Sequence, residues 1–235
     1  MLKYFKPNIY FLFISLIFFL FTALYSQPII IPLGTNCSVA MILNHYQIRR
    51  AAYPFDWIIT NHETTCKILL ENFDQFLNPD HLVIDARGAP VVDTYYGIKF
   101  VHDFPYLVND GKTQQIAPDF LSCWEEVHLK YQRRIERFRK TIENAISQEQ
   151  QIIFIREGHI NQREAVEIQT ILKKLYPNLD FLLVIFTYNS FEKVDWNLPG
   201  IINQYTNYEN LTTSEYLNRE EWKKILIQLN LIQDK

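Results

Sequence analysis

Cys37 is the residue of this sequence that is best placed for chemistry, within the run LGTNCSVA at residues 33–40. It follows an apolar segment at residues 29–33 with the composition of a buried strand, and it opens a segment at residues 37–46 with helical spacing. A thiol at a helix N-terminus lies among unpaired N–H groups and the positive end of the helix dipole, which lower its pKa below the free value of about 8.5. We therefore predict that Cys37 is a nucleophile. The alternative is a buried cysteine that only packs.

A cysteine nucleophile needs a histidine within hydrogen-bond reach to take its proton. His102 ends an apolar strand beside a turn, where its ring can face a cleft, and we predict that it is this base. His159 follows Arg156 at the end of another apolar strand and is the second candidate. The remaining histidines fall on helices or loops without such a context and are interpreted as packing or surface residues: His45, His62, His81 and His128.

Asp56, between Phe55 and Trp57, is the candidate carboxylate that orients the histidine. A carboxylate enclosed by aromatic residues needs a partner, because an unpaired buried charge is costly. A histidine partner would make Asp56 catalytic, whereas an arginine or a helix N-terminus would make it structural, and the structural readings together are favoured. Asp103 is a weaker orienting group for His102, because adjacent strand residues point to opposite faces.

Arg133 and Arg137 lie one turn apart on a predicted long helix at residues 119–147. Such a basic run is usually a solvated helix face. In a second interpretation, one of these arginines acts together with Arg156. The two either form an ion pair with a core carboxylate such as Asp56 or bind an anionic group of a substrate. We treat Arg133, Arg137 and Arg156 as candidate substrate-binding residues.

Other catalytic patterns are absent from the sequence. The turn before Cys37 lacks the second glycine and the lysine of a phosphate-binding loop. No group of histidines and cysteines has zinc spacing, and there is no Gly-x-Ser-x-Gly elbow. No well-spaced acidic pair indicates a carboxylate-based glycan-processing enzyme. We therefore expect neither a metal nor a cofactor.

Residues 1–27 have the layout of a targeting segment, with Lys3 and Lys6 before an almost wholly apolar run at residues 9–24. Small residues are scarce where a signal peptidase would cut, and the run is close to the length that crosses a bilayer. We predict either a signal peptide or an N-terminal membrane anchor. The folded part is then exported (periplasmic or extracellular) or held at the membrane by this segment alone.

Residues 28–235 are enough for one domain with a sizeable core. The aromatic content of 15% and the six glycines are typical of a well-packed globule. A net charge near −3 gives no indication of bulk attraction to nucleic acid, and we expect no such partner. The cysteine count leaves two alternatives: Cys66 and Cys123 form a disulfide and Cys37 is free, or all three are reduced.

The periodicity predicts an α/β fold, with a single domain built on a mainly parallel central sheet flanked by helices. Central strands are expected at residues 29–33, 151–156 and 181–187, and a helix at residues 162–176 makes the last two a βαβ unit. Residues 80–118 are expected to form a small irregular or antiparallel insertion. Further helices are expected at residues 66–77, 119–147 and 214–229.

Ligands of such sheets bind beyond the carboxyl ends of the strands. Residues 34–37, 156–159 and 187–189 follow the three predicted central strands. We therefore expect these segments to meet on one rim, although they are far apart in the sequence.

The chain resembles a bacterial family of unknown function that is catalogued as papain-like cysteine peptidases, over residues 30–186. The resemblance implies that Cys37 is the nucleophile and His102 its base, in the Cys-then-His order of papain-like enzymes. These enzymes also need an oxyanion donor and a third polar residue, for which Asn36 and Asp56 are the candidates. The runs that carry the resemblance are LGTNCSVA at 33–40, AYPFDW at 52–57, FVHDF at 100–104, RRIERF at 133–138 and FIR at 154–156.

Papain-like enzymes pack a helical subdomain against a small antiparallel barrel, which differs from the parallel sheet predicted here. We take the fold from the periodicity and the reaction class from the resemblance, since one catalytic arrangement recurs on unrelated folds. The leading hypothesis is a cysteine hydrolase, or an acyltransferase with the same residues, that acts on a peptide, amide or ester substrate. The alternative is a non-catalytic α/β domain that binds a glycan or an anionic ligand at the cell surface.

Overall fold

The computed structural model of the chain describes residues 28–110 and 112–234. The predicted signal peptide or membrane anchor, residues 1–27, lies outside the described residues. Within the described part, none of the helices combines the length and the apolar character that a membrane span requires.

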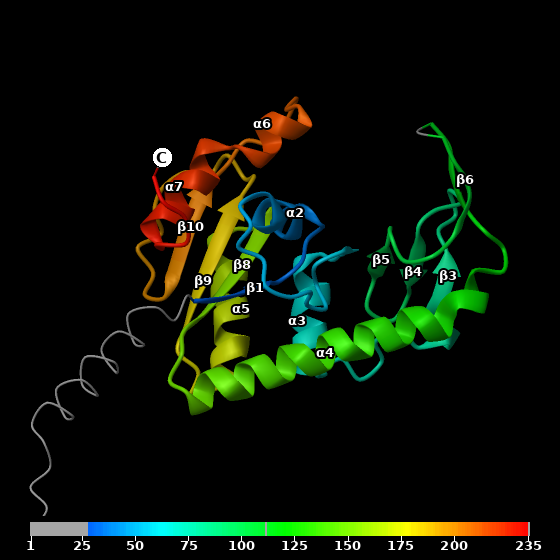
Figure 1. The fold of residues 1–235 in the computed structure, drawn as a ribbon, viewed down its shortest axis with the longest axis horizontal. Coiled ribbons are helices and arrows are strands. Elements are labelled where there is room, and N and C mark those ends of the chain that lie inside the picture. The colour runs from blue at the N-terminus through cyan, green and yellow to red at the C-terminus, as the bar shows by residue number, and fades with distance from the viewer. Residues whose placement is uncertain (1–27, 111, 235) are drawn as a thin grey trace, which may run out of the picture.

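A sheet of four parallel strands forms the centre of the fold (Figure 1). Its strand order is β1 (Ile29–Pro32), β8 (Ile152–Gly158), β9 (Phe181–Thr187) and β10 (Ile201–Tyr205). β8 is buried along its whole length, as expected for a parallel strand covered on both faces. The predicted α/β fold with a mainly parallel sheet is confirmed. The sequence pattern misses β10, because only the first two residues of that strand are apolar.

Alternate side chains of β8 pack into two different hydrophobic layers. One layer contains apolar residues of α4 (Trp124–Ser147) and α5 (Gln162–Leu175). The other contains residues of α2 (Ser38–His45) and α7 (Glu220–Gln228). Three predicted helices are thus confirmed, with bounds that agree to within one turn: those at residues 37–46, 119–147 and 162–176. In the second of these, Phe120–Cys123 form a 3₁₀ turn before the α-helix begins.

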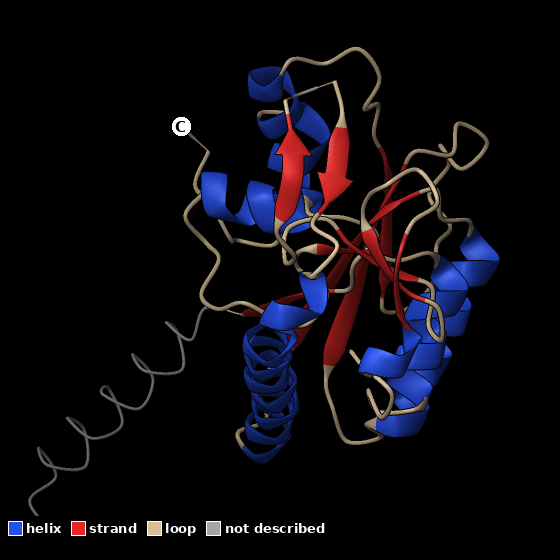
Figure 2. Cartoon of the chain, turned by 90° about the vertical axis from the view of Figure 1, so that its right-hand side faces the viewer, coloured by secondary structure: helices blue, strands red, loops and turns tan. Residues whose placement is uncertain are grey.

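The predicted antiparallel insertion is present as a second four-stranded sheet and a hairpin, both on the side that faces the viewer in Figure 2. In the sheet, β5 pairs with both β2 and β4, and β3 forms an edge. The sheet consists of β2 (Ile58–Ile59), β3 (Leu82–Ile84), β4 (Val91–Asp93) and β5 (Ile98–Phe100), and the hairpin of β6 (Tyr106–Asn109) and β7 (Gln114–Ile116).

The helix predicted at residues 66–77 is wrong in its bounds, because α3 runs over His62–Leu70. Asn72 and Phe73 have positive φ angles of 49° and 64°, which a right-handed helix does not allow. This turn directs Phe73 into the core, where its ring centroid lies 5.6 Å from that of Phe55. The apolar spacing after Leu70 therefore reflects aromatic packing from an irregular segment.

The helix predicted at residues 214–229 is two helices, α6 (Thr213–Leu217) and α7. The chain leaves the helical conformation at Arg219, whose ψ angle is 128°. The guanidinium of Arg219 lies 2.6 Å from the carboxylate of Glu157, and both side chains are buried. The need to bring this ion pair into the core breaks the helix that the apolar periodicity predicts.

All three cysteines are free, so the predicted disulfide between Cys66 and Cys123 is wrong and the reduced alternative is confirmed. The thiol of Cys123 donates to the carbonyl oxygen of Phe120 at 3.1 Å. Cys66 is a buried residue of α3.

Candidate active site at the carboxyl edge of the sheet

The carboxyl edge of the parallel sheet brings the predicted rim segments together. Thr35, between β1 and α2, packs against Gly158 at the end of β8 so closely that a β-carbon on Gly158 would lie 2.7 Å from Thr35 Cγ2. Gly158 pairs with Thr187 of β9, and its carbonyl oxygen accepts the N–H of Tyr188 at 2.9 Å. Loops that are more than a hundred residues apart are therefore neighbours at this edge.

Cys37 is the N-cap residue of α2 and its side chain is half-buried. Asn36 Oδ1 accepts the N–H of Ser38 at 2.8 Å, and the other N–H groups of the first turn have no partner within the helix. Burial raises the pKa of the Cys37 thiol above its usual value, and the hydrogen bond from its own backbone N–H lowers the pKa by less. The expectation of a depressed pKa is therefore wrong, because desolvation outweighs the helix N-terminus.

Among the described residues, no histidine is hydrogen-bonded to the sulfur of Cys37. His102 is exposed, and its ring meets Trp57 edge-on with 5.8 Å between the ring centroids. His159 is also exposed, lies next to Gly158 at the rim, and has its Nε2 3.4 Å from the hydroxyl of Tyr208. His159 therefore shares the sheet edge with the Cys37 turn, whereas His102 projects from the loop after β5.

Asp56 is fully buried and pairs with Arg49. The same carboxylate oxygen accepts the N–H of Tyr53 at 3.0 Å. Arg49 also lies 5.7 Å from the ring centroid of Trp57, the residue that supports His102. The partner of Asp56 is therefore an arginine, and its contacts hold the loop that carries Trp57.

The arginines of α4 differ in their contacts. Arg137 donates to the carbonyl oxygen of Ala52 at 2.5 Å, and Arg133 is exposed. Arg134 lies over the ring of Tyr131, with 4.8 Å from its guanidinium carbon to the ring centroid. These positions support loop anchoring by Arg137, and substrate contact by Arg133 or Arg137 stays a prediction.

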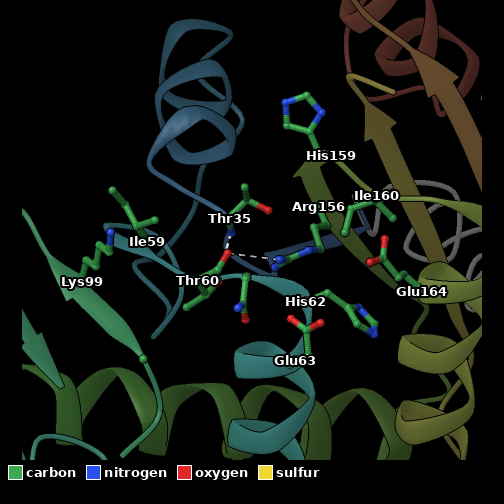
Figure 3. A pocket seen from close by; sticks show the side chains of 12 residues that line it. Thr35, Ile59, Thr60, His62, Glu63, Lys99, Arg156, His159, Ile160 and Glu164 are labelled. Atoms are coloured by element: carbon green, nitrogen blue, oxygen red, sulfur yellow. Dashed lines mark hydrogen bonds between the residues drawn. The ribbon is translucent and has the colours of Figure 1, made fainter. Parts of the chain in front are cut away.

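Arg156 is fully buried and lines a cavity of about 430 Å³ (Figure 3). Its guanidinium donates to Leu33 O at 2.5 Å, to Thr65 Oγ1 at 2.9 Å and to Thr60 O at 3.2 Å. Among the described residues, no carboxylate lies within ion-pair distance of it. Burial lowers its pKa to about 10. Arg156 thus ties β1 to the start of α3, and its role toward a substrate stays a prediction.

A second cysteine has the histidine contact that Cys37 lacks. Cys66 Sγ lies 3.6 Å from Nε2 and 3.9 Å from Nδ1 of His62, one turn earlier on α3. His62 Nε2 also lies 3.0 Å from Glu167 Oε2 on α5. Burial and, to a smaller extent, the negative charges of Glu167, Glu63 and Glu164 raise the pKa of the Cys66 thiol to about 11, although the charge of Arg156 opposes them. The sequence pattern does not predict this cluster, although a histidine and a cysteine four residues apart share one face of a helix.

The fold and the rim define an α/β protein with a thiol at the carboxyl edge of a parallel sheet. Residues 29–190 match the family described as "Putative papain-like cysteine peptidase (DUF1796)", and the chain belongs to this family. The chain is also similar to the uncharacterized protein R408 of Acanthamoeba polyphaga mimivirus, at 24% identity over 231 residues that cover 86% of this chain and 98% of that protein. No solved structure matches the chain.

Proposed function

We propose that the protein is a cysteine hydrolase in which Cys37 attacks an amide or ester bond. The observation that carries this proposal is the position of Cys37, at the start of α2 on the edge where parallel sheets bind their ligands. Its sulfur has no hydrogen bond to another side chain in the part of the chain that the structure describes, so no other side chain competes with a substrate for it. Membership of the peptidase-like family supports the same reaction class.

The motif residues that resemble this family divide into two groups. Asp56, Asp103 and Arg156 have partners that explain them as structural. Asp103 forms an ion pair with Lys130 and accepts a hydrogen bond from the Tyr131 hydroxyl. Among the described residues, Cys37 has no such side-chain partner, and His102 makes a ring contact with Trp57 but no hydrogen bond or ion pair. These two side chains are the ones left for chemistry.

The proposed reaction needs a base, because burial keeps Cys37 in its thiol form at neutral pH. An imidazole takes the thiol proton as the sulfur bonds to the carbonyl carbon. The oxyanion is stabilised by first-turn N–H groups of α2, which Asn36 helps to fix through Ser38. The imidazolium then gives its proton to the leaving group, and water hydrolyses the thioester. In acyl transfer, another nucleophile would replace the water.

Two imidazoles compete for the role of base. His102 is the first candidate, with Asp56 acting through Arg49 and Trp57 as its support. His159 is the second, because it follows the Gly158 that Thr35 touches. Either ring must approach the sulfur when a substrate binds, since catalytic contacts are often long without one.

Incubation with p-nitrophenyl esters and fluorogenic peptide amides, followed by intact-protein mass spectrometry, tests the nucleophile. We expect an acyl adduct on Cys37 and its loss in Cys37→Ser, while Cys123→Ser, a matched change of another partly exposed thiol, keeps it. Loss of turnover in His102→Ala or in His159→Ala alone identifies the base. Unchanged turnover in Cys37→Ser rejects the proposal.

A second candidate function, binding of an anionic ligand, is favoured by Arg156 alone. This buried guanidinium lines the cavity without an ion-pair partner among the described residues, and its Nε has no acceptor there. Lys99 and His159 line the same cavity, and Glu63 and Glu164 line its side toward α3 and α5. Calorimetric titration with sulfated or carboxylated sugars distinguishes the two functions, because binding that survives Cys37→Ser and is lost in Lys99→Gln supports a binding domain.

A further inference from the structure

Three side chains from two helices direct metal-binding atoms to one point beside the cavity. His62 and Cys66 lie one turn apart on α3, and Glu167 reaches them from α5. One ligand atom from each residue lies within 4.8 Å of the others. Thiolate, imidazole and carboxylate are the three ligand types that zinc prefers in proteins.

Two of the three ligand distances are close to those around a tetrahedral ion, and the third, between Cys66 and Glu167, is no longer than 4.8 Å. With zinc bonds of ~2.0–2.3 Å, tetrahedral ligand atoms are ~3.3–3.6 Å apart. The distance from Cys66 Sγ to His62 Nε2 is 3.6 Å, within this range. The distance from His62 Nε2 to Glu167 Oε2 is 3.0 Å, and Glu167 is half-exposed, so its side chain can move by the remaining few tenths of an ångström.

The same three residues do not have the arrangement of a catalytic triad. In a triad the thiol and the carboxylate bind opposite nitrogens of the imidazole. Here the sulfur and the carboxylate both approach Nε2, and the sulfur lies almost equally far from Nδ1, at 3.9 Å. A shared metal ion requires one ligand atom from each residue near a common point, and this arrangement provides it.

The charges around the cluster favour a cation. Glu63 and Glu164 add their negative charges to that of Glu167 close to Cys66, and Arg156 supplies a single opposing charge. His62 and Cys66 are buried, which excludes water from two of the ligands. A divalent ion there would cross-link α3 to α5, and three protein ligands would leave its fourth position for water.

We propose that His62, Cys66 and Glu167 form a binding site for a zinc-like divalent cation. Binding forms a bond between the metal and Cys66 Sγ and releases the thiol proton to solvent. The proton shared between His62 Nε2 and Glu167 leaves for His62 Nδ1 or for solvent, and their hydrogen bond is exchanged for one metal bond to each residue. This site is separate from the proposed Cys37 chemistry, and neither proposal depends on the other.

Titration of the chelator-treated full chain with Co²⁺ tests the site. We expect one ion per chain, a thiolate-to-cobalt charge-transfer absorption, tetrahedral visible bands, and loss of these signals when Zn²⁺ is added. Cys66→Ser should abolish the charge-transfer band. Glu167→Gln, a change of a half-exposed side chain that does not threaten folding, should raise the dissociation constant at least about tenfold.

Two matched variants complete the experiment. Glu63→Gln removes a nearby exposed carboxylate that is not a proposed ligand, and it should change the dissociation constant by less than about threefold. Cys123→Ser removes another thiol and should leave the spectrum unchanged. Absence of a charge-transfer band, or a band that persists in Cys66→Ser, overturns the proposal, as does equal weakening by Glu63→Gln and Glu167→Gln.

Discussion

Thr35 and Gly158 are in direct van der Waals contact at the edge of the sheet, and a β-carbon on Gly158 would lie 2.7 Å from Thr35 Cγ2 and 2.9 Å from Thr35 Oγ1. Glycine is required here because the turn that leads to Cys37 passes directly over the end of β8. The contact fixes where the β1–α2 junction lies relative to the strand that carries Arg156 and leads to His159.

Gly158→Ala should therefore destabilise the protein by about 1–3 kcal/mol, the usual cost of overpacking. The Thr35 hydroxyl has no hydrogen-bond partner among the described residues, so Thr35→Ala loses little by itself. The double variant removes the clash and should recover most of the lost free energy of unfolding, as measured in urea. Additive effects of the two changes on the free energy of unfolding would mean that contact with Thr35 is not what excludes a larger side chain at position 158.

Alkylation of Cys37 by iodoacetamide should be slower at pH 7 than alkylation of a free cysteine. The reason is the raised pKa of the thiol, which lowers the thiolate fraction at every pH below that pKa. The rate should rise with pH and reach its plateau only above the usual thiol pKa of about 8.5. Mass spectrometry of the Cys37 peptide across pH measures this, with Cys37→Ser as the blank. A plateau already at pH 7 would contradict the burial that the structure gives.

The central strands could be predicted because they are continuous apolar runs. Once residues 151–156 and 181–187 are joined by a helix, the topology alone places Cys37 and His159 at one edge. The same reasoning could not find the bend at Arg219, since its cause is Glu157, 62 positions earlier in the chain and buried under α7. Local spacing carries no information about such a partner.

Only part of the candidate site can be predicted from the sequence, as for the fold. The turn before Cys37 has its own signal in the sequence, whereas the cluster of His62, Cys66 and Glu167 depends on α3 meeting α5. His62 and Glu167 are 105 positions apart, and no spacing rule covers that separation. The sequence leaves the partner of Asp56 open among a histidine, an arginine and a helix N-terminus, because enclosure by aromatic residues requires a partner without specifying which one.

Asp56→Asn tests whether Asp56 is structural. The change leaves Arg49 without its carboxylate and should cost about 3 kcal/mol in unfolding free energy, as for other broken buried pairs. Turnover per folded molecule should fall little, because Asp56 contacts no histidine among its described partners and reaches His102 only indirectly, through Arg49 and Trp57. Asp85→Asn, which breaks an exposed pair with Arg87, is the matched control and should leave the unfolding midpoint unchanged. A large loss of turnover with full stability would instead make Asp56 part of the catalytic machinery.

Arg219→Met should destabilise the protein strongly, by about 3–5 kcal/mol, because Glu157 would remain charged and buried. Trp222 Nε1 and the Tyr216 hydroxyl donate to this carboxylate at 3.1 Å and 3.2 Å, which reduces the cost without removing it. Glu157→Gln combined with Arg219→Met removes both charges and should recover more than half of the loss in a urea titration. If Arg219→Met alone is harmless, the ion pair does not set the break between α6 and α7, and hydrogen exchange should then be unchanged at residues 213–228.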